Sequence, residues 1–475
     1  MYQKSHNVDN ISNSDTMAVS KPLIIVAVVA VVAIAAVGAF VFMNGNDKGD
    51  GGDVTPDDYL TPKSGTAKVD SVDTKLFVFG NANNDVYLDN DDVKFIQDIV
   101  DKKTSWNKKT NPLADTNADG EITDKDVKLL KQFIAGKTAP MFYLNSYLDT
   151  TKIQFPLTGK IAVGGFNDVD MLKIIGKSDL VVACTNDMEP NEADYPGSSK
   201  WVKIGTYPYD YETVVSTGAN ITLGQPYMYD KTFDDLAKNG YDKYRMDSVK
   251  LCEARYMHGV EGIACTVTLG ALMNAFNNSL YKSYLDYVAN INSIVEKATA
   301  NIKVGDELSY ALLVTHACNS PSDIGIDNLA TGEENYGDVA TVANLKMVNS
   351  YPAIEGGYIT GLSIEDVLKY EPDVIFIEAV SVNTPKEFHD KVAEVSGWLR
   401  NAGFTGKIVG ITYSVIGNAP SVSVLPLLSA LIYGENYYKE ADAWKDLAFY
   451  YNTFLGQDLT VDELKESMYG AYLVE

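Results

Sequence analysis

Two acidic loops, at residues 81–92 and 115–126, carry the side chains in this chain that are best suited to chemistry. In the second loop, oxygen-bearing groups recur at positions 1, 3, 5, 7, 9 and 12, and glycine stands at position 6. Calcium prefers roughly six to eight hard oxygen ligands, and glycine at the sixth position permits a sharp turn. The ligands predicted for the second loop are Asp115, Asn117, Asp119, Glu121 through its carbonyl, Thr123 and Asp126.

The first loop repeats this design 34 residues earlier in the chain. Its predicted ligands are Asn81, Asn83, Asp85, Tyr87 through its carbonyl, Asp89 and Asp92. Val86 stands where the second loop has glycine, and Asn81 replaces the acidic first ligand. We therefore expect two calcium sites, of which the second is the stronger. The alternative interpretation is a pair of solvated acidic turns.

Each loop leads into apolar residues at helical spacing, which predicts one helix after each loop. The apolar positions are Val93, Ile96, Ile99 and Val100 after the first loop, and Val127, Leu130, Phe133 and Ile134 after the second. This loop-helix repeat over residues 75–137, with Asp at position 12, resembles a dockerin module, a small all-α, EF-hand-like fold. The resemblance implies folding on calcium and a cohesin-bearing surface protein as partner. Positions 10 and 11 (Asn90, Asp91, Asp124 and Lys125) differ from the usual Ser/Thr, so a purely structural calcium module is the alternative.

Residues 23–43 form 21 consecutive positions without a charge. At about 1.5 Å per residue, such a helix crosses a hydrocarbon core of roughly 30 Å. The sequence predicts a cytoplasmic N-terminus at 1–21, a single transmembrane anchor at 22–43 and a linker at 44–74. The protein is then held at the cell membrane with its C-terminal domains outside the cell. A cleaved signal peptide is the alternative.

The composition is strongly acidic, with a formal net charge of −25 and a pI near 4.5. Nucleic-acid binding requires clustered Lys and Arg, and the chain has no such cluster, so this class of partner is excluded. Cys252 and Cys265 are close enough in sequence for a small-loop disulfide, and free buried thiols are the alternative.

Beyond residue 152, strand-like and helical patterns alternate. Strands are predicted at residues 160–163, 180–183, 221–223, 310–314, 374–377 and 407–411. A long amphipathic stretch at 269–300 separates the two sets of strands. The prediction is an α/β protein with two Rossmann-like lobes, at 152–268 and 301–475, joined by one long helix. Ligands bind at the carboxyl ends of the strands in such sheets.

Four segments carry a family resemblance. Residues 159–183 (GKIAVGGFNDVDMLKIIGKSDLVVA) are similar to the opening strand and helix of class III substrate-binding proteins of ABC importers. Residues 210–224 and 362–379 resemble two places where that family has a Glu-containing helix followed by a strand, and 396–420 resembles its C-lobe ending. The resemblance implies an ABC permease as partner and a metal chelate as cargo, of the iron-siderophore, haem or cobalamin type.

The resemblance also assigns roles to individual residues. Glu212 and Glu365 correspond to the family's permease-docking glutamates; ordinary exposed helix glutamates are the alternative. Ligand contacts are expected in the strand-end loops, on both sides of a cleft. They are Phe166, Asn167, Thr185, Asn186, Gln225 and Tyr227 in the first lobe, and His316, Asn319, Glu378, Tyr413 and Asn418 in the second.

The motifs examined for covalent catalysis are absent from the sequence: it contains no G-x-S-x-G, no H-E-x-x-H and no phosphate-binding glycine loop. We therefore expect a binding protein and not an enzyme. A cell-surface scaffold component that docks a cohesin and binds a saccharide or peptide is the alternative. A glycoside hydrolase is a third possibility, and it would need two carboxylates at a fixed separation.

Overall fold

The computed structural model describes residues 74–144, 150–186, 188–206, 210–223, 260–303, 305–327, 345–350, 358–379, 384–412, 421–435, 437–466 and 471–474. By its contacts the chain divides into residues 1–55 and residues 56–475, and every described residue belongs to the second unit. The predicted N-terminus, the anchor and all of the linker except Thr74 lie outside the described residues. Among the described helices, none has the length and apolar character that crossing a bilayer requires.

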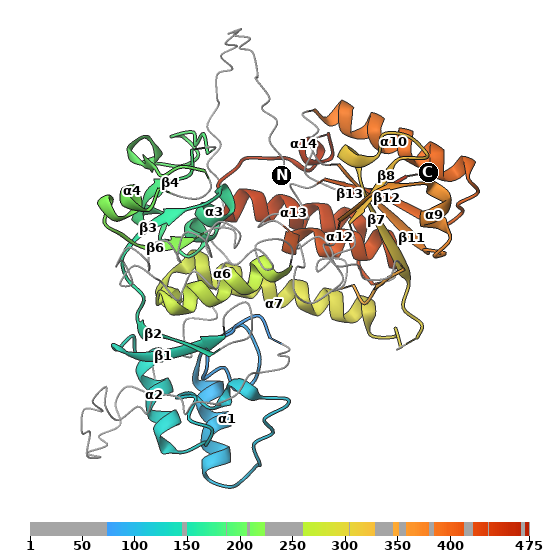
Figure 1. Ribbon diagram of the computed structural model, residues 1–475. Helices are drawn as coiled ribbons and strands as arrows, with labels where there is room; N and C mark the ends of the chain where they lie inside the picture. The colour runs from blue at the N-terminus through green and yellow to red at the C-terminus, as the bar shows by residue number, and fades with distance from the viewer. Residues whose placement is uncertain are drawn as a thin grey trace, which may run out of the picture. The chain divides into compact units, whose positions relative to one another are not determined.

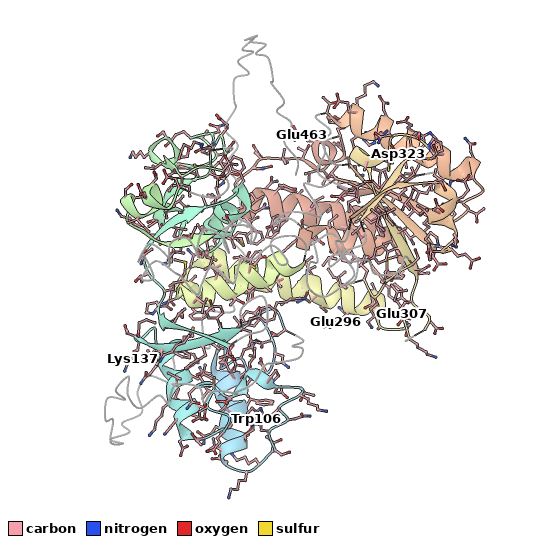
Figure 2. All side chains as sticks on the ribbon, in the orientation of Figure 1. Trp106, Lys137, Glu296, Glu307, Asp323 and Glu463 are labelled. Atoms are coloured by element: carbon pink, nitrogen blue, oxygen red, sulfur yellow. The ribbon has the colours of Figure 1, made fainter. Side chains whose placement is uncertain are left out.

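The two predicted helices of the first module are present. Helix α1 covers Asn90–Val100, helix α2 covers Asp124–Ile134, and the two pack against each other (Figure 1). A short 3₁₀ helix, η2, covers Pro112–Ala114 between them. The indole Nε1 of Trp106 donates to the Asn111 carbonyl oxygen at 2.9 Å, which fastens the connection before η2 (Figure 2).

Both helices begin with the same hydrogen-bonded cap. The side chains of Asp89 and Thr123 accept hydrogen bonds from the first turns of α1 and α2. Asp92 and Asp126, three residues further on, accept hydrogen bonds from the backbone N–H groups of Asp89 and Thr123. This capping box satisfies donors that the start of a helix otherwise leaves unpaired. Loop positions 9 and 12 therefore have a structural role that does not require a cation.

An antiparallel hairpin continues this module beyond its predicted end at residue 137. Strand β1 (Ala139–Leu144) pairs with β2 (Thr150–Phe155), and Val78 forms a β-bridge with Tyr143. The first strand of the following α/β part begins only at Lys160, so residue 152 belongs to the hairpin. The core of the module contains Phe79, Leu113, Ala118, Phe142 and Leu144.

A four-stranded sheet forms the first α/β part, and all its strand pairs are parallel, as the alternating pattern predicts. Its strands, in the order β5-β4-β3-β6, are β3 (Lys160–Val163), β4 (Val181–Cys184), β5 (Val202–Lys203) and β6 (Ala219–Leu223). Helix α3 (Phe166–Ile174) follows β3, and helix α4 (Tyr211–Ser216) precedes β6. Two 3₁₀ turns, η3 (Ser178–Leu180) and η4 (Ser198–Lys200), complete the connections.

A seven-stranded mixed sheet forms the second α/β part (Figure 1). The order β10-β8-β7-β11-β12-β13 has β7, β11 and β12 parallel at its centre and antiparallel strands at its sides, while β9 also pairs with β7. The strands are β7 (Ser309–Val314), β8 (Ile324–Asp327), β9 (Val348–Asn349), β10 (Tyr358–Leu362), β11 (Val374–Ala379), β12 (Lys407–Thr412) and β13 (Ala471–Val474). Helices α9 (Ile364–Leu368) and α10 (Pro385–Asn401) and the 3₁₀ turn η9 (Thr315–Ala317) belong to this part.

The single long helix predicted at 269–300 is wrong in its extent. Two helices occupy this stretch. Helix α6 (Val260–Leu272) ends at Leu272, and α7 (Ser279–Thr299) begins after the turn η8 (Ala275–Asn277). The break follows from Asn274, whose φ of 54° is left-handed and cannot continue a helix. The Asn278 side chain then caps α7 by accepting from Tyr281 N at 2.9 Å.

Helix α7 is also not a solitary connection between the two sheets. It packs against α6 and α12, and α12 packs against α13 and β13, while α3 contacts α6, α7 and α13. The further helices of this group are α12 (Ser421–Tyr433), α13 (Glu440–Phe454) and α14 (Val461–Glu466). Part of the chain's tyrosine content is buried here, where Tyr284, Tyr287 and Tyr450 each pack on the ring of Phe454.

The first module is bonded directly to the helices α6 and α7. The Tyr87 hydroxyl donates to Asp286 Oδ1 on α7 at 2.7 Å, and Phe77 N donates to Thr268 Oγ1 on α6 at 3.0 Å. After β2, Leu157 N donates to the Leu272 carbonyl oxygen at the end of α6. The module is therefore part of the same unit as the two sheets.

The packing of α6 on α7 gives a direct test of this arrangement. A Cβ at Gly270 would lie 2.2 Å from Cε2 of Tyr281, a fully buried ring whose hydroxyl donates to the Val267 carbonyl oxygen. We expect Gly270→Ala to lower the free energy of unfolding by about 1–3 kcal/mol, because the ring must move. The measurement is the urea midpoint.

Gly397→Ala is the matched control, because Gly397 lies in α10 and a Cβ there meets no atom within 4 Å. This change should leave stability unaltered or raise it by up to about 1 kcal/mol, since alanine favours helix. Equal midpoints for the two variants would contradict the close contact between α6 and Tyr281.

Candidate functional site

The second acidic loop is organised by hydrogen bonds from its own backbone. Asp115 Oδ2 accepts from Gly120 N at 2.6 Å, Asn117 Oδ1 accepts from Asp119 N at 3.0 Å, and Asp119 Oδ1 accepts from Glu121 N at 3.0 Å. Gly120 has a φ of 93°, which glycine adopts without strain. The chain therefore turns at position 6, as the sequence predicts.

Burial gives this loop unusual electrostatics. Desolvation raises the pKa of Asp115 to about 7 and that of Asp126 to about 6, and the nearby Asp119 carboxylate adds to both shifts. Asp126 Oδ1 accepts from Asn117 N at 3.1 Å, which joins loop positions 3 and 12. Buried carboxyl groups that form no ion pair disfavour their ionised form, and a cation beside them would reverse that effect.

The donor set of the second loop fits calcium in its chemistry. Within the described ranges, no group of three or more His, Cys, Asp or Glu side chains is arranged as a metal site. Calcium loops, however, also use amide and backbone carbonyl oxygens. Here Asn117 and the Glu121 carbonyl would add to the carboxylates. Calcium binding at both loops stays a prediction.

The first loop keeps part of this hydrogen-bond pattern. Asn83 Oδ1 accepts from Asp85 N at 3.0 Å, and Asp85 Oδ1 accepts from Tyr87 N at 2.7 Å, as at the equivalent positions of the second loop. Its backbone differs, because Asn84 is its only residue with positive φ, whereas Ala118 and Gly120 both have positive φ in the second loop. The turn at position 6 is therefore missing from the first loop.

Asn81, at position 1, bonds in a way that an aspartate could not. Its amide nitrogen lies 2.9 Å from each of three acceptors, which are Thr74 Oγ1, the Leu76 carbonyl oxygen and the Asp85 carbonyl oxygen. An amide donor thus joins loop positions 1 and 5 and ties them to residues 74 and 76, whereas an acidic side chain at position 1 of a calcium loop binds the cation. This geometry agrees with the expectation that the first loop is the weaker site.

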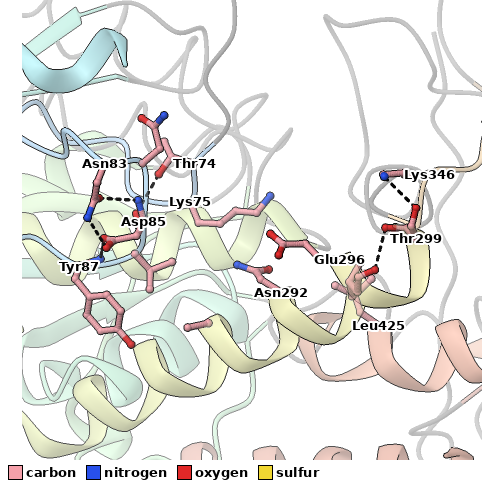
Figure 3. Close-up of a pocket in the computed structure, with 14 residues that line it drawn as sticks. Thr74, Lys75, Asn83, Asp85, Tyr87, Asn292, Glu296, Thr299, Lys346 and Leu425 are labelled. Atoms are coloured by element: carbon pink, nitrogen blue, oxygen red, sulfur yellow. Dashed lines mark hydrogen bonds between the residues drawn. The ribbon is translucent and has the colours of Figure 1, made fainter. Parts of the chain in front are cut away.

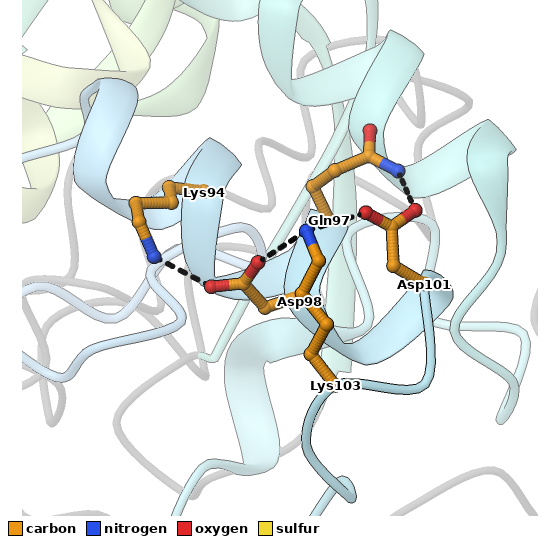
Figure 4. A network of polar contacts seen from close by, with 5 residues as sticks. All are labelled: Lys94, Gln97, Asp98, Asp101 and Lys103. Carbon is orange, nitrogen blue, oxygen red and sulfur yellow. Dashed lines mark hydrogen bonds and ion pairs between the residues drawn. The ribbon is translucent and has the colours of Figure 1, made fainter.

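The surface predicted to read a cohesin is solvent-exposed. The four residues at loop positions 10 and 11 are exposed: Asn90, Asp91, Asp124 and Lys125. A network of ion pairs lies along α1 and just beyond its end (Figure 4). Lys94 Nζ lies 2.5 Å from Asp98, and Lys103 Nζ lies 3.1 Å from Asp98 and 2.8 Å from Asp101. Because water screens exposed ion pairs, this network orients the side chains and adds little stability.

Four predicted ligand contacts lie together at the carboxyl edge of the first sheet. Phe166 and Asn167 begin α3 after β3, and Thr185 and Asn186 follow the neighbouring strand β4. Thr185 Oγ1 donates to the Gly164 carbonyl oxygen at 3.1 Å, which joins the two strand-end loops. Asn186 Oδ1 accepts from Gly205 N at 3.1 Å, so this side chain holds the loop after β5.

An aromatic cluster at this edge was not predicted. The Phe166 ring, which is 37% exposed, lies 5.2 Å from the ring of Tyr195, and Tyr195 lies 6.5 Å from Trp201. Lys173 Nζ lies 4.2 Å from the centre of the Tyr195 ring. Tyr195 and Trp201 lie in the connection between β4 and β5. Their position after a predicted strand was the only feature of the sequence that could have indicated a role at this edge.

Asp168 was also missed. It is fully buried, and its Oδ2 accepts from Gly164 N at 2.9 Å and from Gly165 N at 3.0 Å, while its Oδ1 has no hydrogen-bond partner. Burial raises its pKa to about 7. This carboxyl group fixes the glycine-rich loop that precedes Phe166 and Asn167. The burial of Asp168 results from tertiary packing, and no pattern in the neighbouring sequence indicates it.

The second sheet brings fewer of the predicted contacts together. Glu378 stands in β11 opposite Val314 of β7 and Ile411 of β12, and it is only 1% exposed. His316 lies in η9, directly after β7. Asn319 is exposed, and its amide donates to Asp323 in a local turn.

Several predictions fall outside the described residues. They are the ligand contacts Gln225, Tyr227, Tyr413 and Asn418, together with Cys252. The cleft between the lobes and the Cys252–Cys265 disulfide therefore stay predictions. Cys184, Cys265 and Cys318 are buried.

The two predicted docking glutamates occupy the same local position. Glu212 and Glu365 are each the second residue of a short helix, α4 and α9, and both are exposed. Asp210 and Ser363 cap these helices through their side chains. In each sheet the helix precedes a parallel strand, β6 or β11.

The buried Asp168 predicts a pH effect on stability. Its folded pKa is raised from 3.8 to about 7. The folded state therefore holds a proton that the unfolded chain releases first, and this contribution to stability is lost as the pH rises from about 4 to 8. Relative to Asp168→Asn, which does not titrate, the wild type should lose on the order of 2–4 kcal/mol across that range.

Urea unfolding of both proteins at several pH values measures this difference. Asp179→Asn serves as the control, because Asp179 lies in the nearby turn η3, where no residue is buried. A stability difference between the wild type and Asp168→Asn that stays constant with pH would contradict the burial of an ionisable Asp168.

No family model matches the chain, and no curated protein sequence matches it. The chain is similar to the solved structure of a periplasmic solute-binding protein from Veillonella parvula, with 12% sequence identity, coverage of 69% of this chain and 96% of that chain, and a TM-score of 0.45. It is also similar to an ABC transporter solute-binding protein from Sulfurospirillum deleyianum, with 13% identity, coverage of 68% and 98%, and a TM-score of 0.44. A molybdate-binding periplasmic protein from Haemophilus influenzae gives 11% identity, coverage of 67% and 99%, and a TM-score of 0.44. Because these identities and TM-scores are low, the function proposed below rests on the residues of the chain itself.

Proposed function

We propose that this chain is a membrane-tethered, extracytoplasmic substrate-binding protein of an ABC importer. The observation that carries the proposal is the matched placement of Glu212 and Glu365. Each is exposed at the second position of a capped helix that leads into a parallel strand, one in each sheet. One acidic contact on each sheet suits a partner that binds both parts of the protein at once.

The chemistry of these two side chains supports docking to basic residues. Within the described part of the chain, neither carboxylate makes a hydrogen bond or an ion pair. Charge-assisted pairing of a carboxylate with arginine is strong and directional. Two such pairs would set the orientation of the receptor on a permease and still allow its release.

A metal chelate is the cargo we propose, of the iron-siderophore, haem or cobalamin type. The exposed face of Phe166, backed by Tyr195 and Trp201, offers a surface for a flat conjugated ligand at the carboxyl edge of the first sheet. Lys173 packs over Tyr195 and lies 3.9 Å from Asp170, so it supports the ring and its charge is largely balanced by that carboxyl group. We propose that the uncharged segment 22–43 tethers this receptor to the cell membrane.

We further propose that the second acidic loop holds calcium and that the first loop fills only at higher calcium concentration. The support is the left-handed turn at Gly120 and the burial of Asp115 and Asp126, neither of which forms an ion pair within the described residues. Calcium bound to the folded loop would stabilise the module through mass action.

The second candidate function is a cell-surface scaffold component. It is favoured by the exposure of the equivalent pairs Asn90-Asp91 and Asp124-Lys125, which the two loops present at corresponding positions. In this case the module docks a cohesin, and the α/β part binds a saccharide or peptide. A thermal-shift screen separates the two functions, since iron chelates or corrinoids stabilise an importer receptor and oligosaccharides stabilise a scaffold component.

Replacing both docking residues tests the importer function. We expect Glu212→Ala combined with Glu365→Ala to abolish uptake of the cargo in reconstituted vesicles and to leave its affinity for the receptor unchanged. The reason is that both side chains lie at exposed helix starts, and neither is among the predicted ligand contacts. Uptake and equilibrium binding are measured on the same preparations.

The matched control is Glu189→Ala combined with Glu466→Ala, which removes the same charge from two exposed positions. Uptake should persist in this control. Weakened cargo binding in the Glu212/Glu365 variant would contradict the docking role and place those side chains in the ligand site.

Removing the calcium ligand Asp115 tests the proposed loop. Calcium at about one hundred times its dissociation constant should stabilise the wild-type module by about 2.7 kcal/mol, and Asp115→Ala should abolish that gain. Asp124→Ala, an exposed position on α2, should retain it. Hydrogen exchange of residues 76–136, measured with calcium and with EDTA, reports the effect, and identical exchange in both conditions for the wild type would refute the site.

A further inference from the structure

A polar cavity of about 650 Å³ lies between the first acidic loop and helix α7 (Figure 3). Its size falls within the range of roughly 300–1,000 Å³ that is usual for small-ligand sites. Its walls come from residues 74–75 and 83–87, from α7, and from Lys346 and Leu425. None of the residues predicted to bind the cargo lines it, so it is separate from the strand-end site. Asn83, Asp85 and Tyr87 line one end of it and are also predicted ligands of the first calcium loop, so a ligand bound at Asp85 would compete with calcium there.

The cavity has the form of a groove along one face of α7. The helix contributes Ala289, Asn292, Val295, Glu296 and Thr299 to its lining. These positions are separated by three, three, one and three residues, which is the spacing of a single helix face. Because Ala289 and Thr299 are ten residues apart, the groove follows α7 for about 15 Å at 1.5 Å per residue.

The two ends of the groove carry opposite charges (Figure 3). At the end next to the loop, Asp85 accepts one hydrogen bond on each carboxylate oxygen, from Tyr87 N and from Asn83 Nδ2. An ionised carboxylate has about four acceptor positions, so further donors can bind Asp85. At the far end, Lys346 Nζ donates to the Thr299 carbonyl oxygen at 3.0 Å and has two more protons to donate.

Polar side chains without partners lie between these two ends. The Asn292 amide and the Glu296 carboxylate make no hydrogen bond or ion pair in the part of the chain that the structure describes. In Figure 3 both side chains lie between Asp85 and Lys346, beside Lys75. An asparagine amide can donate to a carbonyl and accept from an N–H, which is the pair of groups that an extended peptide backbone presents.

We propose that this groove binds a short extended peptide, with its terminal ammonium group at Asp85 and its terminal carboxylate at Lys346. The charges at the two ends are complementary to those of a free peptide. An extended chain rises about 3.3 Å per residue, so four residues span about 13 Å and match the groove. Asn292, between the two charged ends of the groove, would form hydrogen bonds with the peptide backbone and would not select particular peptide side chains.

Calorimetric titration of the full chain with alanine peptides, in calcium-free buffer so that Asp85 is available, tests the length and the charges. Tetra-alanine with free termini should bind saturably. Single alanine should bind at least about tenfold more weakly, because it cannot reach both charged ends. Acetylated and amidated tetra-alanine should also lose at least about tenfold in affinity. Failure of tetra-alanine to bind, or equal affinity for the free and capped forms, would overturn the proposal.

Two pairs of variants on the full chain locate the binding site. Asn292→Ala and Lys346→Met should each weaken tetra-alanine binding by about tenfold, the effect of losing one good polar contact. Asn290→Ala and Lys297→Met change the same residue types at exposed positions of α7 outside the lining, and they should bind as the wild type does. Retained affinity in both groove variants would place the peptide elsewhere and overturn the assignment.

Discussion

Helix α7 must satisfy different partners on different sides of its axis, and the rest of the structure is arranged around that requirement. One side carries Tyr281, Tyr284 and Tyr287, which are buried. Another side presents Asp286 to the hydroxyl of Tyr87 from the first module. Because tyrosine buries a large ring and needs a partner for its hydroxyl, such a helix is stable only when apolar and polar contacts are both supplied.

This requirement explains why the acidic-loop module packs as one unit with the α/β part. The backbone of Tyr87 is part of the first loop, and its hydroxyl donates a hydrogen bond to Asp286 on the surface of α7. A second bond, from Phe77 N to Thr268, holds the same module to α6. Any ion that orders the loops therefore also acts on helices that contact the strand-end region through α3. We infer that the acidic-loop module and the α/β part form one mechanical unit.

Local sequence patterns predicted the local structure well. Strand β3 has the predicted bounds, Lys160–Val163, because a short apolar run is bounded by glycines on both sides. The helices after both acidic loops follow from apolar spacing. The break at Asn274 was missed, because the apolar pattern continues through it and only the backbone conformation interrupts the helix. Glu212 and Glu365 lie in short capped helices followed by a strand, as predicted, since caps and first turns are encoded by neighbouring residues.

By itself, the sequence determined the features that residues close along the chain decide: the capping boxes, the left-handed turn at Gly120 and the alternation of strands with helices. Tertiary structure alone decided the burial of Asp168, the cluster of Phe166, Tyr195 and Trp201, and the groove beside α7. The contact between Tyr87 and Asp286 joins residues 199 positions apart. Such contacts depend on how whole elements pack, and the free energy of packing is shared among many residues, so no short pattern encodes it.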